Sequence, residues 1–261
     1  MELNHHSAAV LPYYFNNSGM LSFFLERKSA DLRPPYFNNG LNFFGGNGVK
    51  DDLSPFNLAK REVGEEFHRL DERPESLNEI VGQEFSRESQ EKQRELVDKL
   101  KTWYSLEKIG EIRILVPLLL EGAEFASHYV VMVNPPIMKT PLTYASTIFT
   151  KELSRDEAER IQDLVGKYNG RLTTDNVLRG SRSEFITLDQ INTRGDKFAW
   201  GYCQKLDHLL REGYLPQKNS VGVIRPLRRD LIEVTTLPKD KNLNFSSFEE
   251  FVSLTGHTYK P

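Results

Sequence analysis

The stretch from Gly45 to Phe67 reads GGNGVKDDLSPFNLAKREVGEEF, and the expected fold is organised around it. Two adjacent glycines and a third at Gly48 predict a glycine-rich loop. Ser54 is a favoured N-cap residue, and Pro55 suits the first helical position because its missing N–H has no partner there. The stretch therefore predicts a glycine-rich loop that leads into a helix with a dense run of acids.

Three glutamates share one face of this predicted helix. At about 100° per residue, Glu62, Glu65 and Glu66 fall within roughly a third of its circumference. A neighbouring arc can face a core and holds Phe56, Ala59, Val63, Phe67 and Leu70, whereas Leu58 falls among the acids. Carboxylates on one face repel each other, and a divalent cation with oxygen ligands removes the repulsion. The alternative is an acidic face exposed to solvent, the commoner arrangement for an acidic helix.

From Arg61 the chain reads REVGEE, which resembles the core of the Nudix hydrolase box. That box is G-x5-E-x7-R-E-U-x-E-E-x-G-U, where U is aliphatic. Upstream, Gly46 and five further residues lead to Asp52 in place of Glu, and eight residues instead of seven precede Arg61. Downstream, His68 stands where the family has glycine, and Arg69 where it has an aliphatic residue.

The resemblance implies a fold and a metal site. The fold is the Nudix fold of the α+β class, a mixed β-sheet between helices, here with helical insertions and a C-terminal extension. The implied metal is Mg²⁺ or Mn²⁺, with Glu62, Glu65 and Glu66 as ligands and a backbone carbonyl near Gly46 as a further ligand. Glu62 and Glu66 are also catalytic in this reading, and Arg61 orients a glutamate through a salt bridge.

The resemblance also implies a reaction. It is the metal-dependent hydrolysis of the pyrophosphate bond in a nucleoside diphosphate linked to another group, as in ADP-ribose, a nucleotide sugar or a dinucleotide. The departures on both sides of the REVGEE core leave an alternative open. In that alternative the chain is a catalytically inactive Nudix-like module that binds nucleotides or another partner.

The expected reaction needs a general base and phosphate contacts besides the metal ligands. The base is either a glutamate of the acidic helix or an acid on a later loop. For the later loop we expect Glu184, at the start of a predicted strand, before the weaker candidates Glu121 and Glu124. Guanidinium groups match phosphate oxygens two at a time, and the candidates are Arg27, Arg182 and Arg179. Candidates for stacking on a base are Tyr13, Tyr14 and Tyr36.

Composition fits one large domain, or one domain with insertions, and the small-molecule nucleotide substrate is what the resemblance implies. The chain has 261 residues, of which 38% are hydrophobic and 27% charged. Its net charge of −3 gives no general attraction to long nucleic acid or to an anionic membrane. We expect a Nudix domain over residues 1–216, with insertions at about 71–104 and 135–180, and a C-terminal extension over 217–261.

The single cysteine bears on the cellular compartment. Cys203 has no partner for an internal disulfide, which favours a reducing compartment. A basic region followed by an apolar one is not seen at the start of the sequence, so we expect a cytoplasmic protein. The resemblance adds a homodimer as an arrangement common in the family.

Periodicity predicts the remaining elements. Strands are expected at 7–15 and 20–28, which form a hairpin, and at 41–44, 112–120, 126–134 and 184–188. Besides the acidic helix, helices are expected at 86–104, at 153–168 with a Ser154–Glu157 capping box, and at 197–212. Pro12 and Pro117 predict strand edges or bulges. Residues 71–85, 135–150 and 170–183 are expected to be irregular connections.

Overall fold

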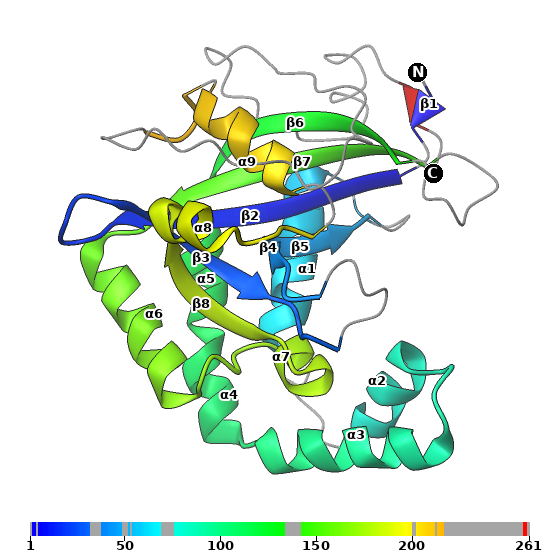
Figure 1. The fold of residues 1–261 in the computed structure, drawn as a ribbon. Helices are drawn as coiled ribbons and strands as arrows, with labels where there is room; N and C mark the ends of the chain where they lie inside the picture. Colours follow the sequence, from blue (N-terminus) through cyan, green and yellow to red (C-terminus); the bar gives the residue numbers. More distant parts are fainter. Residues whose placement is uncertain are drawn as a thin grey trace.

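A computed structural model of the chain describes residues 2–3, 5–31, 38–48, 52, 54–68, 76–133, 142–199, 202–211, 213–216 and 258–259. These residues form a mixed β-sheet with helices on both faces (Figure 1), so the predicted α+β class is confirmed. Among the described helices, none has the length and apolar character needed to span a membrane. Most of the predicted C-terminal extension lies outside the described residues, and the domain boundaries stay predictions.

Strand β2 (His5–Phe15) is the central element of the sheet. It runs parallel to β7 (Leu142–Glu152) on one side. On the other side its first half pairs with β5 (Phe44–Asn47) and its second half with β3 (Leu21–Arg27), both antiparallel. Pro12 pairs with β7 and lies between the two antiparallel partners of β2, so the predicted edge position is wrong. Its missing N–H falls where neither antiparallel ladder needs a donor.

The other strands extend this sheet on both sides. Strands β4 (Leu41–Asn42) and β8 (Arg182–Thr187) pair with β3, and β6 (Glu124–Val133) pairs with β7. A separate small sheet joins β1 (Glu2–Leu3) to β9 (Thr258–Tyr259). The strands expected at 7–15, 20–28, 126–134 and 184–188 are confirmed. The predicted glycine loop is wrong at its start, because Gly45 and Gly46 lie inside β5.

Three expected helices are confirmed with their starts close to the predicted positions. In α1 (Pro55–His68) the Asn57 N–H donates to Ser54 Oγ at 3.1 Å, as expected of an N-cap. Helix α3 (Gln90–Trp103) begins after the N-cap Ser89, and α6 (Arg155–Lys167) has the predicted capping box. The fourth, α9 (Tyr202–Arg211), begins later than expected.

The largest error concerns residues 112–120, which are helical and not a strand. They end α4 (Leu106–Arg113) and form α5 (Leu115–Leu120). A short apolar run fits a buried helix as well as a buried strand, and periodicity alone cannot separate them. Pro117 is the third residue of α5, where a missing N–H breaks no intrahelical hydrogen bond.

Parts of the expected connections are also regular structure. Helix α2 (Leu77–Glu84) lies within 71–85, and α7 (Thr174–Arg179) lies within 170–183. Residues 142–150 belong to β7, which is the parallel partner of β2 and not a cover over a site. Helix α8 (Leu188–Arg194) follows β8 directly. Strand β7 was missed because Pro135 and Pro141 precede a polar, threonine-rich run.

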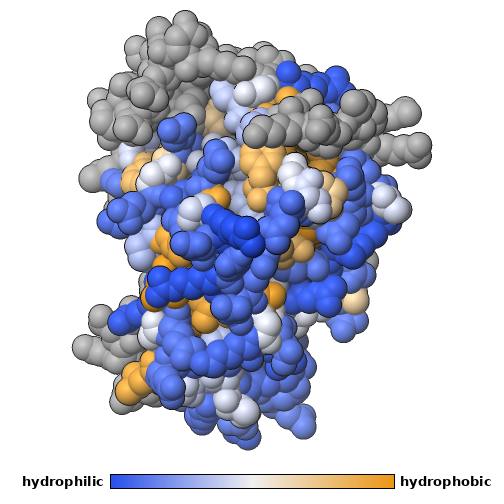
Figure 2. Space-filling model, turned by 90° about the vertical axis from the view of Figure 1, so that its left-hand side faces the viewer, coloured by the Kyte–Doolittle hydropathy of each residue, from blue (hydrophilic) through white to orange (hydrophobic). Residues whose placement is uncertain are grey.

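Each face of the sheet has its own hydrophobic core. Alternate residues of the strands point to opposite faces, so Ala8 and Phe24 pack with α1 and α3–α7, whereas Ala9 and Leu25 pack with α8 and α9. Figure 2 shows one side of the molecule as largely hydrophilic, with only scattered hydrophobic patches. The site described below lies between β5 and α1, on the first of these two faces.

A substitution at Gly45 is a test of the close packing between β5 and β2. A Cβ at this position would overlap the carbonyl oxygen of Ala8 and the Cα of Ala9, and the φ of 150° is unfavourable for other residues. We expect Gly45→Ala to lower the free energy of unfolding by about 3 kcal/mol or more, measured by denaturant titration. The matched control is Gly166→Ala in α6, where nothing lies within 4 Å, and it should not destabilise. Equal stability of the two variants would contradict the packing described here.

Candidate functional site

Two of the three glutamates of α1, Glu62 and Glu66, face strand β5. Leu58, Glu62 and Glu66 follow each other at four-residue spacing along this side of the helix. Leu58 is fully buried, and a Cβ on Gly48 would lie 2.9 Å from its Cδ1. A Cβ on Gly46 would overlap the Glu62 carboxylate. Gly46 in β5 and Gly48 just after it therefore leave the space that Glu62 and Leu58 fill.

This packing corrects the expected core face of α1. Ala59, Val63 and Phe67 are buried as predicted, but Phe56 is 36% exposed. Leu58, expected among solvated acids, belongs to the core instead. Leu70 lies outside the described residues. The helix is rotated toward β5 because a strand without side chains at two positions accepts carboxylates at close range.

Glu66 is the most deeply buried of the three glutamates at its carboxylate. Its Oε1 accepts a hydrogen bond from the Gly45 N–H at 3.4 Å, and its Oε2 is buried without a hydrogen-bond partner among the described residues. Burial, followed by the negative charge of Glu26, raises the pKa of Glu66 well above its usual range. Burial also raises the pKa of Glu62, although Arg61 opposes this shift. Both carboxylates thus lack full compensation for their charge.

Arg61 links the start of α1 to the end of β5. Its Nε and Nη2 donate to the two oxygens of Asp52 at 3.0 and 2.9 Å, and Nη2 also donates to the Asn47 carbonyl at 2.9 Å. Its Nη1 lies 2.9 Å from Glu62 and 3.3 Å from Glu65. Arg61 therefore forms an ion pair with Glu62, and its expected role of orienting a catalytic glutamate stays a prediction. Glu65 turns toward Arg61 and has a side chain that is 41% exposed.

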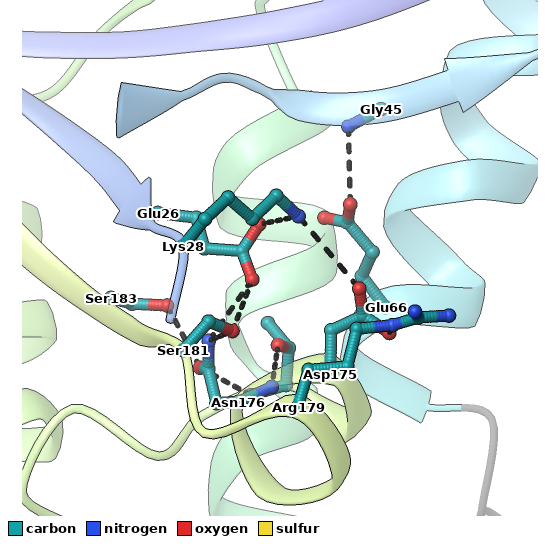
Figure 3. Close-up of polar contacts among 10 residues, drawn as sticks. Glu26, Lys28, Gly45, Glu66, Asp175, Asn176, Arg179, Ser181 and Ser183 are labelled. Atoms are coloured by element: carbon teal, nitrogen blue, oxygen red, sulfur yellow. Dashed lines mark hydrogen bonds and ion pairs between the residues drawn. The ribbon is translucent and has the colours of Figure 1, made fainter. Parts of the chain in front are cut away.

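A second charged group, which the sequence did not reveal, lies beside Glu66 (Figure 3). Glu26 and Lys28 point to the α1 face from the end of β3 and form a buried ion pair. The Lys28 Nζ is also 3.7 Å from Asp175 Oδ2 in α7. Glu26 accepts hydrogen bonds from Ser181 Oγ at 2.6 Å and Asn176 Nδ2 at 3.3 Å. The alternation of Phe24, Glu26 and Lys28 could have indicated that all three side chains point to the same face of the sheet. The residues in α7 and just after it that Glu26 and Lys28 contact are distant in the sequence, so no local pattern predicts the group.

Glu184 and Arg27 lie together on the other face of the sheet. Glu184 is directly opposite Leu25 in the β3–β8 pairing, and Leu25 belongs to the core beneath α8 and α9. Arg27 Nε donates to Glu184, while its Nη1 and Nη2 donate to Asp196 at 2.8 and 3.1 Å. Arg182, with a side chain that is 61% exposed, has its Nη2 4.0 Å from Glu184. The structure therefore brings these three predicted site residues together, but not with Glu62 and Glu66.

The remaining predicted residues are scattered. Arg179 pairs with Asp175 at 3.2 Å and lies over the Phe85 ring at 5.1 Å. Tyr13 donates to Glu152 at 3.3 Å, and Tyr14 accepts from Gln162 at 2.6 Å. Glu121 and Glu124 are exposed, and Tyr36 lies outside the described residues.

Two polar residues of α9 lie on the far side of β5 from Glu62 and Glu66. The Tyr202 ring is 4.3 Å from that of Phe43, and Lys205 Nζ is 4.3 Å from the Tyr202 ring centre. Lys205 also donates to Ser146 Oγ at 2.7 Å. Burial, followed by the charges of Glu66 and Glu62, raises the pKa of Tyr202. The pKa of Lys205 falls to about 7 because the side chain is buried.

The carboxylates of α1 fit a divalent cation that shares its other ligands with substrate or water. Over the described ranges, no three His, Cys, Asp or Glu side chains are grouped so that they could hold a metal ion by themselves. Mg²⁺, however, is commonly held by one or two carboxylates together with waters and substrate phosphates. The Oε2 of Glu66, which has no hydrogen-bond partner among the described residues, and the buried negative charge of Glu62 are the features that such a cation would stabilise.

No protein-family model and no curated protein matches the chain. Among solved structures it is similar to a Nudix hydrolase from M. smegmatis, RenU, with 11% identity, a TM-score of 0.39, and coverage of 82% of this chain and 91% of that chain. It is also similar to the MutT protein from Methanosarcina mazei Go1, with 12% identity, a TM-score of 0.39, and coverage of 81% and 96%. A NUDIX hydrolase from Alicyclobacillus acidocaldarius gives 13% identity, a TM-score of 0.29, and coverage of 62% and 85%. At TM-scores this low the likeness carries no weight on its own.

The role of Arg61 is testable through stability. Asp52 has a side chain that is only 4% exposed, and Arg61→Gln would leave its carboxylate without this partner. We expect the free energy of unfolding to fall by about 2 kcal/mol in denaturant titrations. Arg155→Gln, which breaks an ion pair with both side chains more than half exposed, is the control and should change it by less than about 0.5 kcal/mol. Equal losses of unfolding free energy in the two variants would show that the contacts of Arg61 with Asp52 do not stabilise the fold.

The buried Lys205 predicts a pH dependence of stability. Its folded pKa of about 7 lies below the ordinary value of 10.5, so between these pH values the unfolded chain binds the extra proton. Stability therefore rises with pH in this window, by about 1 kcal/mol per pH unit from this residue. Lys205→Met should make the rise shallower in unfolding curves from pH 7 to 10. The exposed Lys92→Met is the control, and parallel curves for wild type and Lys205→Met would contradict the assignment.

Proposed function

We propose that the chain is a Nudix-type pyrophosphohydrolase that acts on a nucleoside diphosphate linked to another group. The observation that carries the proposal is the placement of the REVGEE glutamates. Glu62 lies against Gly46, and Glu66 has a buried oxygen with no hydrogen-bond partner among the described residues. Burial raises the pKa of both carboxylates. An acidic helix that merely keeps a protein in solution would expose these carboxylates.

The substrate's pyrophosphate brings several negative charges to a site that is already negative. In our proposal Glu62 and Glu66 hold Mg²⁺ or Mn²⁺, with the Gly46 carbonyl as a further ligand. When bound, the cation supplies charge neutralisation and lowers the pKa of a water molecule. Arg61 keeps Glu62 in place through its contacts with Asp52 and Asn47. Glu65, which contacts Arg61, has a lesser role as a ligand.

Hydrolysis requires that a water oxygen bond to one phosphorus while the bond from that phosphorus to the bridging oxygen breaks. The proton of the water passes to a general base. A glutamate of α1 is the better supported of the two kinds of base expected, because Glu184 projects from the opposite face and is held by Arg27. The α1 glutamates are close to where the pyrophosphate must bind if they hold its cation.

The substrate class follows from the family resemblance and the overall charge. ADP-ribose, a nucleotide sugar or a dinucleotide fits the proposal, and the net charge of −3 does not favour long nucleic acid. A cytoplasmic location and a homodimer stay predictions from the sequence.

A second function is favoured by one feature of the site. Glu62 and Glu65 both contact Arg61, and the described part of the chain has no group of three metal-binding side chains. A Nudix-like module that binds nucleotides without hydrolysing them would have this arrangement. The two functions differ in whether nucleotide binding is followed by product release.

The decisive experiment is a panel of nucleotides incubated with the protein and Mg²⁺ or Mn²⁺, with released monophosphate as the readout. We expect hydrolysis of at least one nucleoside diphosphate derivative, and a loss of at least about 100-fold in Glu66→Gln, which keeps the shape of the side chain but not its charge. The control is Glu95→Gln in α3, where the side chain is 52% exposed. Full activity in a folded Glu66→Gln protein would refute the proposal. Nucleotide binding by the wild type without any hydrolysis would support the binding module instead.

A further inference from the structure

Lys28 is surrounded by more carboxylates than a simple structural ion pair needs. Its ammonium contacts two carboxylates, those of Glu26 and Asp175, and a third, that of Glu66, is near enough for their charges to interact. Lys28 is 7% exposed and Glu26 is 2% exposed. A single pair would balance the charge of the lysine, whereas a further buried carboxylate, that of Glu66, adds a cost of desolvation.

The surroundings hold these charges in fixed positions. Glu26 accepts hydrogen bonds from Ser181 and Asn176, and Asn176 Oδ1 accepts one from Ser183 Oγ at 3.0 Å. Asp175 is held by Arg179 at 3.2 Å. Figure 3 shows Lys28 between Glu26 and Asp175, with the Glu66 carboxylate close by. The ammonium thus lies among carboxylates, as a bound cation would.

We propose that Lys28 is a built-in counter-cation of the carboxylates around Glu66, and that it weakens the binding of a divalent cation until an anionic substrate is present. This inference rests on the proposed function, since it assumes that Glu66 helps to hold the cation. Lys28 is a positioning residue here, because it acts on the cation through Glu66. The pyrophosphate of a substrate adds the negative charge that offsets the ammonium, so cation and substrate bind more favourably together than separately.

The test is the affinity for Mn²⁺ in the absence of nucleotide, measured at pH 8 by calorimetry and by the electron paramagnetic resonance signal of free Mn²⁺. At this pH protons compete less for the carboxylates. We expect Lys28→Met to bind Mn²⁺ about tenfold more tightly than wild type, because a positive charge close to the site is removed. Lys28→Arg keeps the charge and should bind as wild type does. Lys92→Met, in the exposed pair with Glu95, is the control for loss of a distant lysine.

The double variant Glu26→Gln/Lys28→Met removes one negative and one positive charge, so the net charge of the group is unchanged. We expect its Mn²⁺ affinity to return toward that of wild type, and it also serves if Lys28→Met alone does not fold, which thermal unfolding would reveal. Wild-type affinity, or weaker binding, in folded Lys28→Met would overturn the inference. In the double variant, a tenfold change from wild type in either direction would also overturn it.

These outcomes separate the inference from the proposed function. A wild-type protein that binds Mn²⁺ and hydrolyses a nucleotide, together with a folded Lys28→Met of unchanged Mn²⁺ affinity, refutes only the role of Lys28. A wild-type protein that neither binds Mn²⁺ nor hydrolyses any nucleotide refutes the proposed function, and the inference with it. Nucleotide present during the titration should reduce the difference between wild type and Lys28→Met, a result that a purely structural lysine would not give.

Discussion

The packing of two carboxylates against the two adjacent glycines of β5 is the constraint on which the site depends. Gly46 has room for Glu62 only because it has no Cβ, and Gly45 approaches β2 so closely that its backbone N–H can face Glu66. The same closeness fixes the rotation of α1 about its axis, with Leu58 buried and Phe56 half exposed. Glycine is needed at these positions because a side chain would not fit between β5 and its neighbours, more than because glycine is flexible.

The sheet creates the place for that strand. Strands β2 and β3 are paired only near their hairpin, and farther along β2 takes β5 as its partner while β3 pairs with β4. The segment 41–47 therefore fills the space where β2 and β3 separate. Because β3 ends at this same point, Glu26 and Lys28 reach the carboxylates of α1 from a second direction. Residues far apart in the sequence therefore lie close together at the point where β2 and β3 separate.

The sequence predicted the parts of this arrangement that depend on local signals. Ser54 and Ser154 mark the starts of two helices, because each caps its helix through a hydrogen bond to a residue nearby in the sequence. The residue pattern of β2 and β8 marks them as strands. The REVGEE stretch could be found as a motif. The sequence could not distinguish a buried helix from a strand at 112–120, where both patterns are apolar. Lys28 and Asp175 were missed because their contact spans 147 residues and follows no motif. Glu184 was placed in the right strand, yet the face of that strand depends on register, which a motif does not encode.

The two faces of the sheet differ in the balance of charge among their described residues. Consecutive residues of β3 point to opposite faces, so Arg27 joins one charged group and Glu26 and Lys28 the other. On the face of α8 and α9 the charges of the described group around Arg27 balance, since Arg27 and Arg182 contact Glu184 and Asp196. On the face of α1, among the residues that the structure describes, contacts and charge interactions join three cations to six carboxylates: Lys28, Arg61 and Arg179 with Glu26, Asp52, Glu62, Glu65, Glu66 and Asp175. An excess of negative charge in a partly buried group is costly unless it binds a cation or a proton, and the raised pKa values of Glu62 and Glu66 express that cost. This imbalance among the described residues, more than any single glutamate, supports the proposal of a divalent cation beside α1.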